Sequence, residues 1–351
     1  MARGLKALVL IAAAAIALAA SGSSAAVPAA AVARGSGTAI LAEDGSQIRR
    51  FGAFSFYSLA GLLFAGSGGA RGDTVVAANA VTGKVRFRIE DAFGPVVLGS
   101  SRVAFLPDHA GRRDPQGNSV WLRSTRGTIR RIVQFANGPG LPGIQTGLPD
   151  AGAILDLAFD SAGRKLAVAE GNDLDLFFYD IWVVDVGTGT AFRATKGARS
   201  RFPSLSPDGR ALAYLREDEH CGGPESGYRA GDLMTVAAVK GAAARVLLDG
   251  SCAVFYTEPH WLSASELAAV RLTRTAPGVY RNDLVLVDTA TSAVAVLASS
   301  GDVFGLSVSP GRRMIGYMRF AVGSVLFDVD DHTTVTVPNG FAPKLAGDRT
   351  W

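Results

Sequence analysis

Cysteine is nearly missing from this chain, which has 2 in 351 residues. A scaffold held together by several disulfides is therefore excluded, and a hydrophobic core has to supply the stability. Charged residues make up only 19% of the chain and apolar residues 48%, a balance that excludes a largely disordered protein. Beyond the N-terminal segment, no apolar run reaches the roughly 18 residues that a membrane-spanning helix needs.

Recognisable catalytic motifs are also missing. The chain has no Gly-x-Ser-x-Gly, so the nucleophile elbow of an α/β-hydrolase is absent. The formal net charge is only +4, and it falls to +2 if Arg3 and Lys6 leave with an export segment. A protein this close to neutrality gives little support to a nucleic acid as its partner. Because no catalytic motif is present, no catalytic residue is assigned, and an enzyme is less favoured than a binding protein.

The N-terminus is typical of a secretory signal. Arg3 and Lys6 precede an apolar segment over 7–20, which is too short for a comfortable membrane span. Small residues allow cleavage after Ala19 or after Ala33, and an uncleaved membrane anchor is the alternative. We expect residues 1–33 to be a signal peptide with a loose tail, and residues 34–351 to form one domain. The expected location is secreted or periplasmic, with no membrane span once the signal is removed.

The rest of the chain is built from repeated strand–turn–strand units. Each unit has a small or acidic residue, a β-rich run, a turn and a second β-rich run. The spacings between successive starts are 35, 45, 62, 52, 51 and 40 residues. The units begin at Thr38, Asp73, Asn118, Asp180, Asp232, Asp283 and Gly323.

A second signature lies between these units. Ser206-Pro207-Asp208-Gly209-Arg210, followed by Tyr214, is the clearest copy; weaker copies lie at 157–168 and 306–318, and degenerate ones at 103–107 and 258–263. Proline presets φ, aspartate tolerates turn geometry and glycine supplies positive φ, so the chain reverses between two buried strands. Four strands in every 40 to 50 residues is the arithmetic of a β-propeller blade.

These residues resemble the repeat of the TolB-type, WD40-like propellers. The resemblance implies an all-β fold, a β-propeller of four-stranded antiparallel blades, from a family of exported propellers used mostly as binding platforms. Six blades are expected near 53–91, 95–136, 152–197, 198–250, 253–299 and 302–338. A hairpin at 38–50 and a terminal piece at 341–351 would join to close the ring as a seventh blade. Six blades with terminal caps, or an all-β sandwich pair, are the alternatives.

The two cysteines are expected to form a disulfide. Cys221 lies in the longest loop between the second and third strands of a blade, and Cys252 lies in the connection to the next blade. Both kinds of connection emerge on the same face of a propeller, and an exported setting favours oxidation.

Long loops on that face predict where a ligand binds. The loops near 108–117, 170–179, 216–231 and 274–282 belong to consecutive blades and should form one rim. Asp173 and Asp175 are weak candidates for calcium, because the full spacing of a calcium loop is missing; no other metal or cofactor is expected. The candidate rim residues are Asp108, His109, Asp173, Asp175, Glu217, Asp218, His220, Arg274 and Arg281.

The sequence therefore predicts an exported, non-catalytic propeller that binds a protein, a peptide or a cell-envelope component. The alternative is a propeller enzyme, such as a metal-assisted lactonase or another small-molecule hydrolase, with its site at the central channel. A cluster of acidic, Asn or His side chains at the channel entrance would favour the enzyme. A channel lined by small residues and backbone would favour the binding protein.

Overall fold

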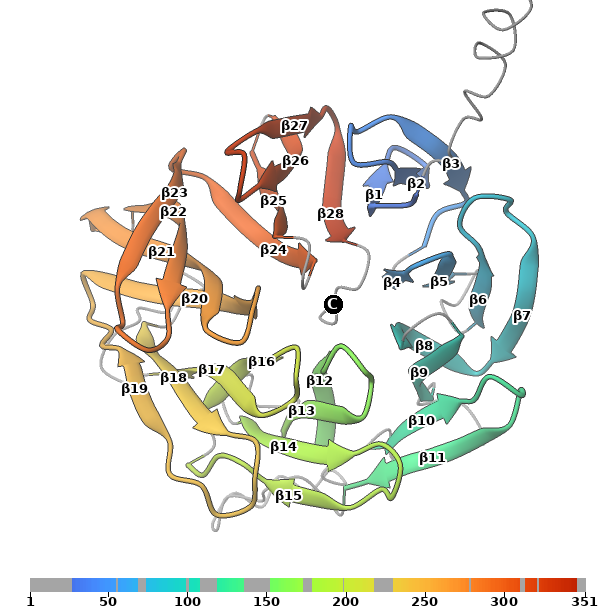
Figure 1. Ribbon diagram of the computed structural model, residues 1–351, viewed down its shortest axis with the longest axis horizontal. Helices are drawn as coiled ribbons and strands as arrows, with labels where there is room; N and C mark the ends of the chain where they lie inside the picture. The colour runs from blue at the N-terminus through green and yellow to red at the C-terminus, as the bar shows by residue number, and fades with distance from the viewer. Residues whose placement is uncertain are drawn as a thin grey trace, which may run out of the picture.

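Seven four-stranded antiparallel sheets are arranged as blades around a central axis (Figure 1). This is the β-propeller that the repeat predicts, with the favoured number of blades. The computed structural model describes residues 27–54, 56–68, 74–98, 101–107, 119–135, 152–172, 179–197, 199–217, 230–277, 279–309, 313–320 and 322–345. Within this part of the chain, no helix is long and apolar enough to cross a membrane.

Each blade is a meander whose first strand, a, lies nearest the axis and whose last, d, lies at the rim (Figure 1). Blades 2, 3 and 4 lie close to the first three of the six predicted ranges. Blade 2 contains β4 (Phe56–Ala60), β5 (Leu63–Ser67), β6 (Thr74–Asn79) and β7 (Val85–Glu90). Blade 3 contains β8 (Ala92–Leu98), β9 (Arg102–Pro107), β10 (Ser119–Arg123) and β11 (Ile129–Gln134). Blade 4 contains β12 (Gly152–Phe159), β13 (Lys165–Asn172), β14 (Tyr179–Asp185) and β15 (Ala191–Arg193).

The next three blades follow the same order. Blade 5 contains β16 (Ser200–Leu205), β17 (Ala211–Glu217), β18 (Gly231–Ala237) and β19 (Arg245–Leu248). Blade 6 contains β20 (Val254–Trp261), β21 (Glu266–Ala276), β22 (Val279–Asp288) and β23 (Val294–Ser299). Blade 7 contains β24 (Val303–Ser309), β25 (Met314–Arg319), β26 (Gly323–Asp328) and β27 (Thr334–Val337).

Blade 1 is split between the two ends of the chain, as the sequence predicts. Its a strand is β28 (Gly340–Leu345), and its other strands are β1 (Ala30–Arg34), β2 (Gly37–Leu41) and β3 (Gln47–Phe51). The ring closes where β1 pairs with β28, with Ala30 opposite Leu345 and Arg34 opposite Gly340. Closure leaves no innermost strand without a partner.

The composition of the closing blade differs from the expectation in one respect. The sequence predicts that the C-terminal piece supplies the a strand and the start of the b strand, but β1 supplies the b strand, mostly from residues assigned to the loose tail. Ala30, Ala31 and Val32 are all fully buried, because β1 is a central strand between β28 and β2. A boundary after residue 33 therefore falls inside a strand of the propeller.

Tyr57 reinforces the closure from the neighbouring blade. Its buried hydroxyl accepts a hydrogen bond from the Ala33 amide at 2.9 Å and donates one to the Phe341 carbonyl at 3.2 Å. One side chain of blade 2 thus holds both halves of blade 1. Each such bond contributes about 1 kcal/mol net.

The turns between strands a and b explain the repeat signature. In blade 5 the Ser206 hydroxyl accepts hydrogen bonds from the amides of Arg210 and Ala211 at 3.1 and 2.9 Å, and Gly209 has a φ of +71°. In blade 4, Asp160 takes the place of Ser206 and accepts from the amides of Arg164 and Lys165 at 2.6 and 3.0 Å. The signature is therefore a turn that orients the following b strand.

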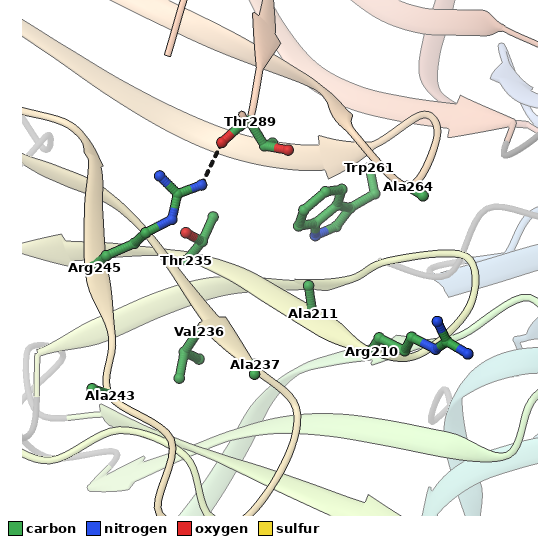
Figure 2. Close-up of a pocket in the computed structure, with 10 residues that line it drawn as sticks. All are labelled: Arg210, Ala211, Thr235, Val236, Ala237, Ala243, Arg245, Trp261, Ala264 and Thr289. Atoms are coloured by element: carbon green, nitrogen blue, oxygen red, sulfur yellow. Dashed lines mark hydrogen bonds between the residues drawn. The ribbon is translucent and has the colours of Figure 1, made fainter. Parts of the chain in front are cut away.

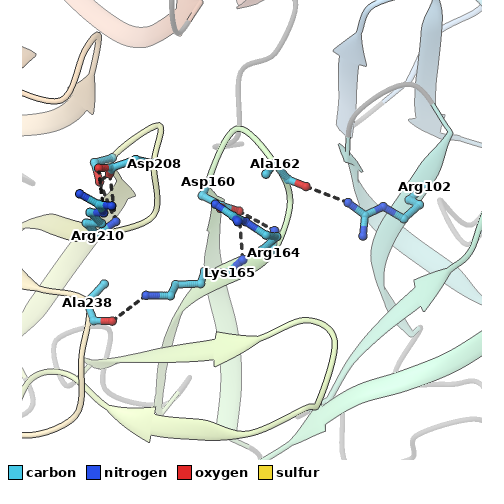
Figure 3. A network of polar contacts seen from close by, with 9 residues as sticks. Arg102, Asp160, Ala162, Arg164, Lys165, Asp208, Arg210 and Ala238 are labelled. Carbon is cyan, nitrogen blue, oxygen red and sulfur yellow. Dashed lines mark hydrogen bonds and ion pairs between the residues drawn. The ribbon is translucent and has the colours of Figure 1, made fainter.

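Long side chains that follow these turns connect neighbouring blades (Figure 3). Arg102 of blade 3 donates from Nη2 to the Ala162 carbonyl of blade 4 at 2.9 Å. Lys165 of blade 4 donates from Nζ to the Ala238 carbonyl of blade 5, also at 2.9 Å. Between the blades, the apolar faces of the sheets form separate clusters, one for each pair of neighbouring blades.

The propeller has two different faces. The b–c loops and d–a connections emerge on one, which we call the long-loop face; the a–b and c–d turns emerge on the other, the short-turn face. Because β1 is a b strand and β28 is an a strand, Ala30 and Leu345 both lie at the short-turn face.

We predict that a chain lacking residues 1–33 is far less stable than one lacking residues 1–26. The shorter chain loses β1, so β28 and β2 lose their common partner. The expected result is a fall in melting temperature on the order of 10 °C, measured by circular dichroism. Equal melting of the two chains would show that β1 does not close the ring.

Candidate functional site

Six of the nine predicted rim residues lie outside the described residues: Asp108, His109, Asp173, Asp175, Asp218 and His220. The weak calcium hypothesis, which rests on Asp173 and Asp175, is therefore untested. Glu217, Arg274 and Arg281 are described, and all three lie on b or c strands at their long-loop ends.

Arg274 and Arg281 lie on a hairpin and not on a loop. The sequence expects a loop over 274–282, but β21 and β22 stay paired through it, with Arg274 opposite Tyr280 and Thr273 opposite Arg281. The hairpin extends beyond the other strands of blade 6, so it projects from the long-loop face. Arg274 is exposed, and Arg281 is half-exposed beside Asp283.

Glu217 is buried, in contrast to the predicted exposed rim position. Its side chain is 3% exposed, and its carboxylate lies 3.2 Å from Nη1 of Arg201. The Arg201 guanidinium also lies over the rings of Tyr179 and Phe202, at 5.5 and 5.1 Å from their centroids. Glu217 therefore orients Arg201 at the long-loop end of the junction between blades 4 and 5.

Acidic residues recur at one equivalent position of the c strand in blades 4, 5 and 6. Asp180, Asp232 and Asp283 occupy this position, and the residues opposite them on the b strands are Glu170, Arg216 and Arg271. In blades 5 and 6 the result is an Arg–Asp ion pair within the sheet. Asp180 is paired instead with Arg193 from the d strand.

Asp283 shows how such a pair is stabilised. It is fully buried, and it accepts hydrogen bonds from Nη2 of Arg271 at 2.8 Å and from the Ser299 hydroxyl at 2.7 Å. Burial by itself would raise the pKa of Asp283, but these bonds and the nearby Arg271 and Arg281 charges hold it below its usual range.

Glu170 breaks this pattern by placing a second carboxyl group beside a buried aspartate. It is 2% exposed, and its Oε1 has no hydrogen-bond partner within the part of the chain that the structure describes. Burial raises the pKa of Glu170 to about 7; Asp180 raises it further, and the nearby Trp182 and Arg193 lower it in part. Glu170 therefore changes protonation near neutral pH.

The innermost strands carry a second feature, a bulge with left-handed backbone. The register with the b strand shifts within β8, β16, β20 and β24. Gly94 and Gly305 have positive φ at two of these bulges, but Phe202 and Glu258 occupy the others with φ of +53° and +50°. Side chains rarely adopt this backbone, so both residues are held there by their surroundings.

Glu258 uses this strained position to bind the next blade. Its Oε2 accepts a hydrogen bond from the Leu306 amide of β24 at 2.6 Å. Burial raises the pKa of the Glu258 carboxyl, and the amides of Leu306 and Gly305 and the charge of Lys344 oppose that rise. Glu258 therefore stabilises the junction of blades 6 and 7.

Serine hydroxyls do the same at three other junctions of innermost strands. In each case a serine on one a strand accepts a hydrogen bond from a backbone amide of the next a strand. The donor–acceptor pairs are Val97–Ser58 at 3.1 Å, Trp261–Ser204 at 3.2 Å and Leu345–Ser307 at 2.8 Å. Small polar side chains and backbone therefore form the contacts around the axis.

An aromatic rim surrounds part of the long-loop face. Phe56, Phe93, Phe304 and Phe341 lie at the start of a strands, and Phe320 follows the b strand β25. The rings of Phe304 and Phe320 stack with centroids 4.5 Å apart, and those of Phe56 and Phe93 lie 6.3 Å apart. Phe320 and Phe341 are 70% and 57% exposed. The rim spans blades 7, 1, 2 and 3, and it overlaps at blade 3 with the sector of the predicted polar loops.

The sequence alone does not reveal these groups, because it does not give the register in which the strands pair. The aromatic residues were visible, but only the assignment of strand starts places them on one face. Glu258 and Phe202 each precede a proline within an expected a strand. A proline directly after the left-handed residue is therefore a sequence signal of these bulges. Within the described residues, no group of three or more His, Cys, Asp or Glu could hold a metal ion.

The anchors of the two cysteine segments lie together. Cys252 is exposed in the connection from β19 to β20, and Cys221 lies outside the described residues, in the segment between β17 and β18. At the bases of these segments Gly250 packs on Gly231, so closely that a Cβ on Gly250 would lie 2.0 Å from the Gly231 carbonyl oxygen. The described part of the chain has no free cysteine.

Comparison with known proteins bears on the fold alone. No protein-family model and no curated protein matches the sequence. Among solved structures, TolB from Acinetobacter baumannii is 14% identical, with a TM-score of 0.51 over 91% of this chain and 82% of that one. The chain forms a TolB-like β-propeller.

Enzymes share this TolB-like fold. An oligogalacturonate lyase in complex with manganese is 14% identical, with a TM-score of 0.61 over 89% of this chain and 84% of that one. The tricorn protease is 12% identical, with a TM-score of 0.63 over 91% of this chain but only 34% of the protease chain. At such identities the likeness establishes the propeller and not the activity.

We predict that Glu170→Gln stabilises the protein above pH 7 and leaves it unchanged below about pH 4. The folded state raises the pKa of Glu170 from 4.5 to about 7. Its stabilising contribution is therefore complete below the unfolded pKa and is lost as pH rises through the folded pKa. The expected gain at pH 8 is about 1–3 kcal/mol in the free energy of unfolding, measured with urea.

Asp283→Asn is the matched control, because its carboxylate has the opposite shift. The pKa of Asp283 is lowered in the folded protein, so the substitution should destabilise at neutral pH, and its effect should fade as pH falls through that pKa. If Glu170→Gln lowered the stability at every pH, the conclusion that burial raises the pKa of Glu170 would be contradicted.

We predict a disulfide between Cys221 and Cys252. A disulfide between them closes a loop of about 30 residues, which stabilises the folded protein by about 3–4 kcal/mol in the chain-entropy model. Mass spectrometry of unreduced protein should show no free thiol, and the double Cys→Ser variant should unfold at lower urea concentration. Two thiols that react with a maleimide in air-exposed native protein would refute the pairing.

Proposed function

We propose that this protein is an exported, non-catalytic binding module that docks a protein or peptide on its long-loop face. The aromatic rim is the observation that carries the proposal. Exposed aromatic side chains are enriched in protein–protein interfaces, where they supply most of the binding energy. Phe320 and Phe341 expose more than half of their surface on adjacent blades of the long-loop face.

Polar groups beside the rim supply orientation. Arg274 projects on the extended hairpin of blade 6, and Arg319 of blade 7 lies 3.0 Å from Asp302 near Phe320. Rim charges of this kind direct association and register more than they add affinity. An aromatic anchor with a mixed polar border is the usual composition of a transient protein interface.

The contacts around the axis support binding over catalysis. The Glu258 carboxylate is occupied by an amide of the next blade, and Ser58, Ser204 and Ser307 accept hydrogen bonds from backbone amides. Groups used in this way hold the ring together. A propeller enzyme remains the second candidate, because similar solved structures include an oligogalacturonate lyase and a protease.

Export forms part of the proposal. Arg3, Lys6 and the apolar segment 7–20 have the order of a signal peptide. Cleavage after Ala19 would retain β1, whereas cleavage after Ala33 would remove four of its five residues. We therefore favour Ala19, which N-terminal sequencing of protein isolated from its host would test.

The function is tested by capture from the host envelope fraction with the mature protein. The double variant Phe320→Ser, Phe341→Ser should lose at least about tenfold in affinity for the captured partner, because each anchor contributes on the order of 1–2 kcal/mol. Leu62→Ser is the matched control: Leu62 is 48% exposed, but it lies in an a–b turn on the short-turn face.

Two outcomes would reject the proposal. One is unchanged binding by the double variant together with loss in Leu62→Ser, which would place the partner on the other face. The other is saturable turnover in a broad panel of esters, lactones and peptides, which would establish the enzyme instead.

A further inference from the structure

A cavity of about 280 Å³ lies between blades 5 and 6 (Figure 2). The strand ends and turns that line it place it on the short-turn face, opposite the aromatic rim. Its walls come from the start of β17, the end of β18 and the start of β19 in blade 5. Blade 6 contributes the end of β20 and two turns. We call this cavity the Ala211 groove, after the residue that creates it.

Comparison of the blades explains why a cavity lies at this junction. Ala211 is the first residue of β17, directly after the a–b turn. Lys165 holds this place in blade 4 and Glu266 in blade 6. Lys165 reaches the Ala238 carbonyl of the next blade, and Glu266 forms an ion pair with Arg313 of the next blade. In three other blades the position is also occupied by a long side chain: Leu63, Arg102 and Met314.

Ala211 is too short to cross its groove, and its neighbours do not replace it. Arg245 lies where blade 4 has Phe192, which packs into the apolar cluster between blades 4 and 5. Arg245 instead donates a hydrogen bond to the Thr289 carbonyl at the outer end of the groove (Figure 2). The space between Ala211 and Arg245 is therefore left open.

The groove combines cationic, polar and apolar groups. Arg210 and Arg245 lie on its two sides, and no acidic residue is among those that line it. The hydroxyl of Thr235 is buried and has no hydrogen-bond partner within the described part of the chain. Trp261 forms part of the wall, with its indole N–H bound to the Ser204 carbonyl at 3.0 Å, so that its ring contributes apolar surface.

We propose that the Ala211 groove binds a carboxylate carried on a small apolar body. Guanidinium groups bind carboxylates with paired, charge-assisted hydrogen bonds, and Arg245 uses only one of its five N–H donors for Thr289. The lone Thr235 hydroxyl at the wall gains a partner when a polar group enters. Alanine side chains and Trp261 match an apolar body, and the volume lies just below the usual range for ligand sites.

The carboxylate could belong to a free small acid or to the C-terminus of a peptide. The probes are hexanoate against hexanamide, and N-acetyl-alanyl-leucine against its C-terminal amide. Binding is followed through the indole N–H resonance of Trp261 in ¹⁵N-labelled protein, identified by its loss in Trp261→Phe. Each acid should shift this resonance saturably, and each amide at least about tenfold more weakly.

Ala211→Lys should abolish the shift by copying the side chain that fills the junction of blades 4 and 5. Ala211→Met, which copies Met314, tests the same point without a charge. Thr235→Val should weaken binding about threefold to tenfold while keeping the shape of the wall. The control is Val246→Thr, at an exposed position next to Arg245 that does not line the groove.

Tighter binding of the peptide acid would assign a peptide C-terminus as the ligand, and tighter binding of hexanoate a free acid; either supports the site. Equal shifts by acid and amide would overturn the carboxylate specificity. Shifts that persist in both Ala211 variants, or no saturable shift with any probe, would overturn the site itself. None of these outcomes bears on the aromatic rim, because the two surfaces lie on opposite faces.

Discussion

The pairing of β1 with β28 is the constraint on which the remaining structure depends. Six blades are continuous in sequence, and each needs neighbours on both sides to bury its two apolar faces. Only the seventh, assembled from both ends of the chain, supplies the missing neighbour to blades 2 and 7. Tyr57 of blade 2 connects both halves of blade 1 through hydrogen bonds to the backbone. Glu258 and the three serines form similar side-chain-to-backbone hydrogen bonds between other innermost strands. The ring is thus stabilised by polar contacts near its centre and apolar contacts farther out.

The repeated architecture also shows at which positions one blade differs from another. A position that recurs in every blade has one geometric environment, so a substitution there changes the chemistry while the sheet remains. Arg216 and Arg271 neutralise the aspartate opposite them, whereas Glu170 adds a second acid at the same place. Lys165 and Glu266 cross to the next blade, whereas Ala211 leaves a cavity. Both departures lie in neighbouring blades, where the repeat signature is otherwise clearest.

The fold was predictable because turn chemistry is local. Pro207, Asp208 and Gly209 determine a reversal without reference to the rest of the chain, and the copies of this turn together with seven strand–turn–strand units leave few architectures open. β1 was not predictable, because Ala30–Arg34 has the composition of an export segment and becomes a strand only between two partners. The sites depend on register: a bulge, or a shift by one residue, decides whether Glu217 is displayed or buried and which side chains meet. That information comes from pairing and not from composition.

Both ends of the described chain lie at the short-turn face, where β1 begins and β28 ends. An attachment made at Ala30 or at Leu345 would therefore hold the ring at this face. The long-loop face, with the aromatic rim, then points away from the attachment. The Ala211 groove lies on the attached face, so such an attachment would shield the groove and leave the rim accessible.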